Sequence, residues 1–380
     1  MSAGAVDGRF SSVSSSGAGA AGVTQNVTYT AATVDLAVAP VAEGATLGDM
    51  PQTGSPTAIV APIDSSLFTA AGSAALLGGQ AAGARLLDHE ARRCANNGED
   101  ATAQCASADG TLWLATSGDR LSVNGNRGAA PGFSASQYQF TTGVDWRFGQ
   151  QTAGVALSYL HDDLAEEGSG DSDRVDTLRV SLYGAHHAGP VLLSGMLSYG
   201  YDDVHTRRPF GAIGTAIGNS GGSEVAAGVQ ASVRLPIGSV ALTPHMGGLY
   251  GYFHGNAFSE NGAGGQNLQV GTDNAHSLQP YFGVALDKTF GDTVHPVKLQ
   301  LSLDQTYELL QRSRTLNVSS GDGTPFSASG ASLPRARLIA GVRLDGEVTK
   351  QLHVSVGFTG WFNTGAGSQR SVDASVRYSF

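Results

Sequence analysis

The feature that most constrains the fold is an alternation of polar and apolar residues in the last thirteen positions, SQRSVDASVRYSF, which is strict from Ser371 to Phe380. Successive side chains of a β-strand point to opposite faces, so alternate residues share one face. One face of this segment is polar, while the other is apolar and ends in Val376, Tyr378 and Phe380. A soluble protein would bury the apolar face in its core. A transmembrane barrel would turn it to lipid and direct the polar face to a wet lumen.

The same two-sided pattern recurs from Leu112 to the end of the chain. In one segment, for example, Val225, Ala227 and Val229 alternate with Glu224 and Gln230. About twelve such segments have the length that a tilted membrane strand needs. They cover residues 112–120, 135–148, 152–162, 174–186, 190–203, 223–235, 239–254, 276–290, 295–308, 335–347, 350–362 and 368–380.

The connections between these segments and the aromatic residues at their ends favour the membrane barrel. Short connections at 149–151, 187–190, 236–238, 291–294 and 349–350 alternate with long ones at 121–134, 163–173, 204–222, 255–275 and 309–334, and with a shorter one at 363–367. Tight turns on one side and long loops on the other are typical of up-and-down membrane barrels, whereas a Greek-key sandwich would mix the lengths. Aromatic side chains at strand ends match interfacial girdles. The sequence therefore predicts an all-β, 12-stranded antiparallel transmembrane barrel.

Composition agrees with this prediction and limits the partners. Only 14% of the residues are charged and the mean hydropathy is −0.07, which suits strands that are half polar. The sequence contains no apolar run of about 18 residues, so we expect no transmembrane helix. The formal net charge of −10 argues against broad binding of nucleic acid.

The first 111 residues divide into four parts by composition. Residues 1–42 predict short strands that would suit the end rung of a β-solenoid, and 43–64 is a Pro-containing linker. Residues 65–93 predict a helix rich in Ala and Gly, whose glycines each cost about 1 kcal/mol relative to Ala. From the residues alone, the better interpretation of this helix is an ordinary packed one. Residues 94–111 connect it to the predicted barrel.

Two further features bear on compartment and processing. Cys94 and Cys105 are close in sequence, which allows one disulfide in an oxidising compartment, and we predict that they form it. A metal site there is disfavoured because no further Cys lies nearby, and we predict no metal and no cofactor for this chain. The N-terminus lacks a basic segment followed by an apolar one, so we expect a fragment or a start inside a longer gene rather than a signal peptide.

At this point the chain resembles the translocator end of an autotransporter (type V secretion). The parts match in order: a last piece of β-helical passenger, a helix, and a barrel of twelve strands that ends in Phe380. The segments TGVDWR at 142–147 and GVALSY at 154–159 resemble the second and third strands of that family, and LTPHM at 242–246 resembles a later one. The segments GRF at 8–10 and VDLAV at 34–38 resemble its final passenger rungs.

The resemblance implies a location, a mechanism and a set of partners. The barrel would insert as a monomer into the outer membrane of a Gram-negative bacterium, with its last strand (Val376, Tyr378, Phe380) recognised by the barrel assembly machinery and with help from periplasmic chaperones. It would export or anchor its own N-terminal passenger, and the helix of residues 65–93 would remain threaded through the lumen. The cysteines are unusual for the family, but they would lie at the periplasmic mouth.

The strand register assigns a set of charged side chains to the lumen. Their expected role is to pair with one another across a wet pore or with the threaded helix. They are Asp145, Arg147, Arg179, Glu224, Arg234, Asp287, Asp304, Arg337 and Arg343.

Two other functions compete with a translocator, and catalysis has weak support. An outer-membrane hydrolase of the phospholipase kind would need an outward-facing Ser and His on neighbouring strands, which the predicted register does not offer. A passive porin would not need the helix. The pair His186-His187 fits a solvated turn better than a metal site, Asp202 fits surface polarity, and cleavage at Asn96-Asn97 is disfavoured because it would lie between the cysteines. We therefore predict no enzymatic activity.

Overall fold

The computed structural model describes most of the predicted barrel and the helix before it. The described residues are 23–29 and 34–40 (backbone only), 66–95 (side chains to 92), 110–125, 130–291, 295–310, 314–321, 323, 325–362 and 365–380. No helix within these ranges has the length and apolarity to cross a bilayer. The connector at 96–109 lies outside them.

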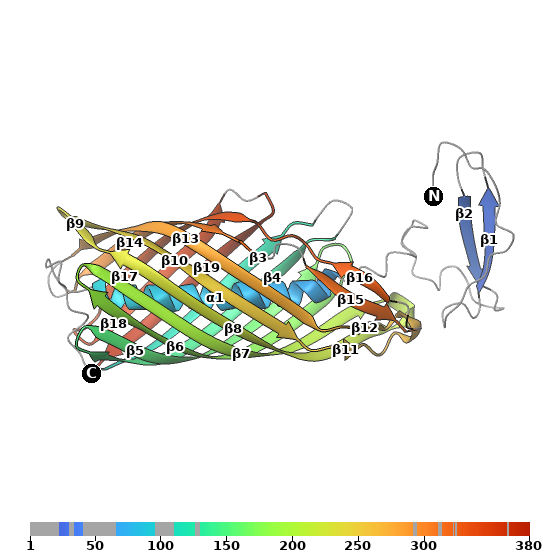
Figure 1. The fold of residues 1–380 in the computed structure, drawn as a ribbon, viewed down its shortest axis with the longest axis horizontal. Coiled ribbons are helices and arrows are strands. Elements are labelled where there is room, and N and C mark those ends of the chain that lie inside the picture. The colour runs from blue at the N-terminus through green and yellow to red at the C-terminus, as the bar shows by residue number, and fades with distance from the viewer. Residues whose placement is uncertain are drawn as a thin grey trace.

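Twelve antiparallel strands form a closed barrel, as the sequence predicts (Figure 1). Each strand pairs with its neighbours in the chain, and the barrel closes where the last strand pairs with the first, with Val376 opposite Leu114. A three-residue strand, β9 (Leu235–Ile237), continues β8 along β10 after a break at Arg234. The twelve strands are β3 (Gly110–Val123), β4 (Phe133–Phe148), β5 (Gln151–Glu166), β6 (Ser172–Ala188), β7 (Val191–Pro209), β8 (Thr215–Val233), β10 (Val240–Gly255), β13 (Asp273–Phe290), β14 (Val297–Tyr307), β17 (Ala336–Glu347), β18 (Leu352–Phe362) and β19 (Gly367–Ser379).

Several strands are longer than predicted at the end that carries the long loops. The segments 163–173 and 204–222 are largely strand: β5 runs to Glu166, β7 runs to Pro209 and β8 begins at Thr215. The prediction of long irregular loops there is wrong. The alternation is lost because the outward face becomes polar beyond the apolar band and the inward face mixes polar and apolar residues, while main-chain pairing between the strands continues. We call this end of the barrel the outer end, and the end with the short turns the inner end.

Two of the other long loops, 255–275 and 309–334, contain a small sheet that the sequence reading missed. Strands β11 (Phe258–Ser259), β12 (Leu268–Val270), β15 (Thr315–Ser320) and β16 (Pro325–Ser329) pair in that order at the outer end (Figure 1). One short 3₁₀ turn, Gly264–Gln266, lies between β11 and β12, and another, Gly211–Ile213, joins β7 to β8. These strands have two to six residues, which is too few for alternation to be recognised against a Gly- and Ser-rich background.

At the inner end, three connections are two-residue turns that depend on glycine: β4 to β5, β6 to β7 and β9 to β10. Gly149, Gly189 and Gly238 have φ near +60°, which a residue with a Cβ adopts only with strain. These turns keep the inner edge short, in contrast to the outer edge.

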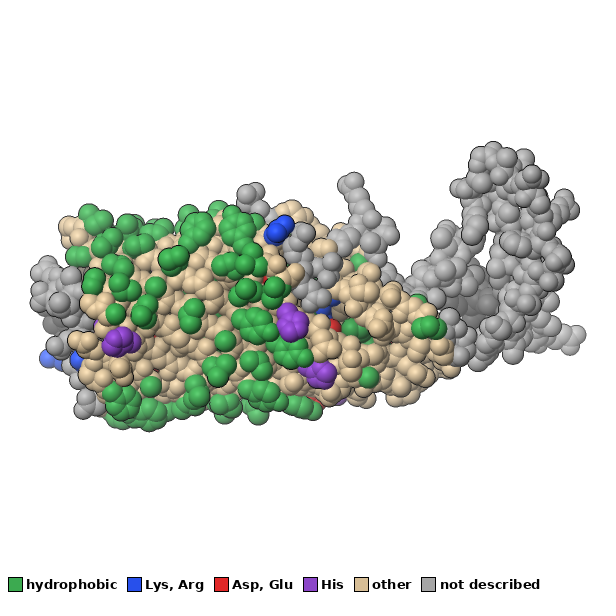
Figure 2. Space-filling model, viewed as in Figure 1, with side chains coloured by type: hydrophobic (Ala, Val, Ile, Leu, Met, Phe, Trp, Pro, Cys, Tyr) green, Lys and Arg blue, Asp and Glu red, His purple; other side chains and the backbone are tan. Residues whose placement is uncertain are grey.

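The outer surface of the barrel is apolar (Figure 2). Outward-facing positions carry exposed Leu, Val and aromatic side chains, and the inward positions that alternate with them are buried or partly buried. Exposed aromatics occur near both ends of the strands, as expected for girdles at the two membrane interfaces. Near the inner end they include Trp146, Phe148, Phe290, Tyr378 and Phe380, and towards the outer end Tyr138, Tyr159, Tyr199, Tyr201 and Phe362.

Before the barrel, β1 (Val23–Tyr29) and β2 (Val34–Pro40) form an antiparallel pair. These strands fall in the segment 1–42, where the sequence predicts short strands. Their assignment to the end of a passenger stays a prediction, as does the linker at 43–64, which lies outside the described residues.

Candidate functional site

The candidate site is the lumen of the barrel, which holds the helix α1 (Ser66–Ala95) (Figure 1). Ser66 donates a hydrogen bond to Glu166 at the outer end of β5, and Glu90 accepts one from Thr152 at the inner end of the same strand. A helix rises 1.5 Å per residue, so these 24 steps span about 36 Å, which exceeds a hydrocarbon core of about 30 Å. The helix therefore runs through the whole membrane-spanning part of the lumen, from the long loops to the short turns.

The small residues of α1 allow the close approach between helix and wall. A Cβ on Gly79 would lie 3.2 Å from a carboxylate oxygen of Glu224, and one on Gly78 would lie 3.0 Å from Leu160. Glu224 forms a fully buried ion pair with Arg179, so both charges lie against the helix backbone. The glycines that weaken an isolated helix thus allow α1 to lie close to Leu160 of β5 and Glu224 of β8.

In the outer half of the lumen, α1 is enclosed by apolar side chains that we call the collar. On the helix they are Ala70, Ala71, Ala74 and Leu77, all buried. On the wall, these helix residues are surrounded by inward-facing residues of β3–β7 and β18, and by residues of the segment that follows β16. Phe253 of β10 and Ala275 of β13 cover the remaining side of the helix. The wall residues of the collar are Leu121, Val123, Phe133, Ala135, Leu164, Val175, Val204, Ala331, Leu333 and Trp361.

The small outer sheet covers the first turn of α1. Phe68 packs against Leu268, Val270, Leu316 and Val318, and its ring meets that of Phe258 edge to face at 5.6 Å. These contacts extend the apolar surroundings of the helix up to its first turn.

Two arginines tie the outer loops to this end of the helix. Arg208 is buried, forms a bidentate pair with Glu260 (2.8 and 2.6 Å) and lies 5.5 Å from the ring centre of Phe68. Arg314 binds Asp273 and also donates to the Thr69 carbonyl oxygen (2.7 Å). Helix, small sheet and loops therefore form one connected unit at the outer mouth.

In the inner half, the apolar contacts of α1 lie mainly on one side. Leu86 and Leu87 share a buried cluster with Trp113, Tyr183 and Met196 of the β3–β7 wall, which extends to Leu249 of β10. On the opposite side lies a cavity of about 270 Å³ between the helix and strands β10, β13, β14 and β17–β19. Its lining mixes apolar side chains such as Leu249 and Ile339 with charged ones such as Asp119, Asp304 and Arg343, and these charged groups make this half of the lumen the wetter one.

Polar side chains tether the helix across this region. Arg85 binds Asp119 (2.8 Å) and also donates to Gln139 (3.0 Å) and Ser371 (3.1 Å). Closer to the outer end, Gln80 donates to Ser277 (2.6 Å) and accepts a hydrogen bond from Gln279. Gln279 in turn donates to Glu308 and accepts from Arg337. Asp88 pairs with Arg92 along the helix at 3.4 Å.

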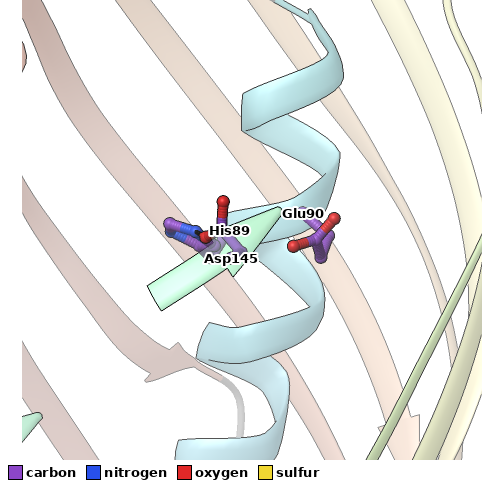
Figure 3. Close-up of side chains that lie close together, drawn as sticks. All are labelled: His89, Glu90 and Asp145. Carbon is purple, nitrogen blue, oxygen red and sulfur yellow. Dashed lines mark hydrogen bonds and ion pairs between the residues drawn. The ribbon is translucent and has the colours of Figure 1, made fainter. Parts of the chain in front are cut away.

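At the inner end, His89 and Glu90 contact the wall in a buried group of side chains (Figure 3). His89 Nε2 lies 2.9 Å from Asp145 Oδ2, and its ring is 4.6 Å from that of Trp113. Trp113 Nε1 donates to the Tyr183 hydroxyl (2.7 Å), which in turn donates to Asp145 (3.2 Å). Glycines make room for the rings, because a Cβ on Gly143 would meet Trp113 at 2.5 Å.

The structure brings most of the charged residues assigned to the lumen into pairs. Arg179 pairs with Glu224, Arg234 with Asp287 (2.9 Å) and Arg343 with Asp373 (2.7 Å). Two of the aspartates contact histidines: Asp145 contacts His89, and Asp304 contacts His245. Arg337 donates to Gln279 and lies over the Trp361 ring. Arg147 differs, because it is partly exposed at the short turn and donates to the Gly149 carbonyl oxygen (3.0 Å).

In the last strand, the outward face is the apolar one. Val376, Tyr378 and Phe380 are exposed on the outer surface, and Asp373 faces the lumen. Phe380 exchanges main-chain hydrogen bonds with Gly110 (3.0 and 3.3 Å), and its ring covers that glycine so closely that a Cβ there would lie 2.6 Å from it. The final residue thus lies on the seam where β3 meets β19.

Sequence reasoning missed several residues of the site and misplaced one. Asp119, His89, Arg208 and Arg314 hold the helix or the outer mouth and were not singled out. Asp202 was assigned to the surface, but it is fully buried and accepts a hydrogen bond from Thr177 (2.6 Å), because β7 continues past the predicted strand end. The inward parity of Asp119 and Asp202 on extended strands was the signal that would have found them. The side chains of Cys94 and Cys105 and the pair Asn96-Asn97 lie outside the described residues.

Comparisons with known proteins agree with this architecture. A family model described as the autotransporter β-domain matches residues 112–359. Among solved structures, the translocator domain of the autotransporter NalP from Neisseria meningitidis aligns with a TM-score of 0.65 at 19% identity, covering 84% of this chain and 100% of that one. The β-domain of the Bordetella autotransporter BrkA (TM-score 0.54, 17% identity) covers 72% and 100%, and the transport unit of AIDA-I from Escherichia coli (0.54, 14%) covers 71% and 90%. A search of curated proteins finds no match.

An outer-membrane β-barrel with a helix in its lumen is the class of protein that the fold defines. The chain belongs to the autotransporter β-domain family, whose members are translocators in the outer membrane of Gram-negative bacteria and are typically non-catalytic. The family implies an associated passenger.

Proposed function

We propose that this chain exports its own N-terminal passenger and then holds it at the cell surface, and that the arrangement described above is the state after export. The observation that carries this proposal is the direction of α1. Its first residue lies at the outer mouth and its last turns lie near the short turns, so the helix enters the lumen from the outer side. A helix that fills the lumen in this direction is what remains when the preceding chain has passed outward.

Lumen charges and the collar have separate parts in this proposal. The pairs around Arg179, Arg234 and Arg343 and the tether at Arg85 would hold the helix in register, while the collar would limit leakage of solutes. The partners that we propose are outer-membrane lipid, the barrel assembly machinery, periplasmic chaperones and the passenger itself, with the barrel working as a monomer and without nucleic acid.

The proposal is tested by measuring ion conductance of the full chain and of a variant that lacks residues 1–93, both reconstituted in planar bilayers. We expect the full chain to conduct weakly and the deletion to conduct several-fold more, because α1 and its tethers occupy the lumen. Equal conductance of the two proteins would contradict a plugged translocator and would favour a passive porin.

Assembly through the last strand is tested separately. Deleting Phe380 removes the ring over Gly110 and one pair of main-chain hydrogen bonds at the seam. We expect a lower amount of protein in the outer membrane and more periplasmic degradation, measured by fractionation and immunoblotting. A matched control replaces Phe362, an exposed aromatic near the outer end of β18, by Leu and should leave the level unchanged. Unchanged levels after deletion of Phe380 would contradict the assignment of Val376, Tyr378 and Phe380 as an assembly signal.

A further inference from the structure

Side chains of three metal-ligating types converge where the inner end of α1 meets the wall. One ligand atom each from His89, Glu90 and Asp145 lies within 4.8 Å of the other two. Glu90 and Asp145 have no exposed surface, and His89 is 8% exposed. Figure 3 shows His89 and Asp145 together on one side of α1 and Glu90 on the other side of the ribbon in that view.

We propose that His89, Glu90 and Asp145 bind one divalent transition-metal ion, of which Zn²⁺ is the type, and that this ion fastens the inner end of α1 to β4. An imidazole nitrogen and carboxylate oxygens are ligands that Zn²⁺ accepts, with three protein ligands leaving one position for water. Two carboxylates this close repel each other strongly away from bulk water, and a dication between them replaces that repulsion with attraction.

The three side chains are oriented by a layer of buried partners. Tyr183 donates to Asp145 and is itself held by Trp113, Thr152 donates to Glu90, and the Trp113 ring lies against His89. Metal ligands in proteins are commonly fixed by such outer hydrogen bonds, which set their orientation before the ion binds. The cluster therefore has the support that a preformed site needs.

An independent observation beside the cluster points to a missing ligand. Thr111 lies directly opposite Asp145 in the β3–β4 pairing and faces the lumen with no exposed surface. Among the described residues, its hydroxyl has no hydrogen-bond partner. Cross-strand neighbours have Cβ atoms about 4.5–5.5 Å apart, so this hydroxyl is close to the carboxylate. Buried polar groups are nearly always satisfied, and an ion or its bound water would satisfy this one.

The cluster also has a route for an ion. His89 and Trp113 line a cavity of about 70 Å³ in the inner half of the lumen, together with Arg92, Thr141 and Ser158. A metal site needs such a path, because a fully enclosed cluster would be filled only during folding. An ion would reach the cluster through this cavity.

The test is titration of Zn²⁺ into the full chain in detergent, after stripping with EDTA, in competition with a chromophoric chelator. We expect one tight site. Removing an outer hydrogen-bond partner of a metal ligand typically weakens metal affinity by about 10- to 100-fold. We therefore expect Y183F to weaken Zn²⁺ affinity by about 10-fold. Each of the ligand substitutions H89Q, E90Q and D145N should weaken it by more than about 100-fold. The matched control is H245Q, which removes a lumen histidine that also contacts an aspartate, Asp304, and should leave the affinity unchanged.

Wild-type affinity in any of the three ligand variants overturns the proposal, because surface histidines would then explain the binding. Loss of affinity in H245Q also overturns it, because the pair of His245 and Asp304 would then be the site. Folding of each variant is checked by the shift in migration between heated and unheated samples on a denaturing gel. If a ligand variant does not fold, Co²⁺ bound to the wild-type chain decides. An intense visible spectrum of a low-coordinate site supports the proposal, and the weak spectrum of the hydrated ion overturns it.

Discussion

In the outer half of the lumen, apolar side chains enclose α1 on most sides, whereas in the inner half the helix leans on one side of the wall and faces a polar cavity on the other. The two halves divide two tasks of a filled pore. A close apolar fit excludes water and so limits leakage, whereas charged tethers across a wet space fix position with weaker individual contacts. We therefore expect the permeability barrier of this barrel to lie in the outer half.

The largest expected difference comes from placing the same charge in each half. Ala74 is fully buried in the collar and Ala84 is exposed to the cavity. Ala74→Asp should lower the free energy of unfolding in lipid vesicles by several kcal/mol, because the carboxylate loses its hydration without a partner. Ala84→Asp should cost about 1 kcal/mol or less. Urea unfolding of both variants measures the difference, and equal losses would mean that the collar is not dry.

Next in size is the contrast between two arginines that hold the helix. Arg314 in the outer half is buried with Asp273, whereas Arg85 in the inner half keeps 29% of its side chain exposed beside Asp119. Arg314→Met should cost about 3–5 kcal/mol, because Asp273 loses its charge partner and the Thr69 carbonyl oxygen loses its donor. Arg85→Met should cost less, because Arg85 is partly solvated already and Asp119, although buried, keeps hydrogen bonds from Ser117 and Gln369. The same unfolding experiment at low and high salt sharpens the comparison, since only the Arg85 tether should weaken with added salt. A larger loss for Arg85 would reverse our assignment of the wet half.

The two halves also differ in how far the sequence predicts them. Strand number, order and the outward faces follow from alternation in the membrane-spanning segments, and the Ala- and Gly-rich composition indicates a slim helix. The polar lumen of the inner half was expected, because inward positions such as Glu224 and Arg343 are charged. The collar was not expected, since Leu164, Val175 and Val204 lie where both strand faces mix polar and apolar residues.

Contacts between distant segments were beyond sequence reasoning for a physical reason. Whether Arg85 reaches Asp119, or His89 reaches Asp145, depends on the rotation and height of the helix inside the barrel. Those two quantities are set by the sum of many small packing contacts, such as those of Gly78 and Gly79, and no local pattern encodes them. The small outer sheet was missed for the complementary reason that its strands are too short to show a period.

The smallest perturbation maps the boundary between the halves directly. Single cysteines replace Ala74 or Ala84 in a background where Cys94 and Cys105 are changed to Ser, so each variant carries one thiol of nearly the size of alanine. A small water-soluble maleimide added to the folded barrel should label Ala84→Cys, which faces the cavity, and should leave Ala74→Cys unlabelled until the barrel is unfolded, because the collar excludes both water and reagent. Stability should change by less than about 1 kcal/mol in either variant, so labelling reports access rather than unfolding.

A third cysteine at Ala81, which lines the cavity and is partly exposed, should react at an intermediate rate. Rapid labelling at Ala74 would show that water reaches the outer half and would move the permeability barrier to the small sheet around Phe68.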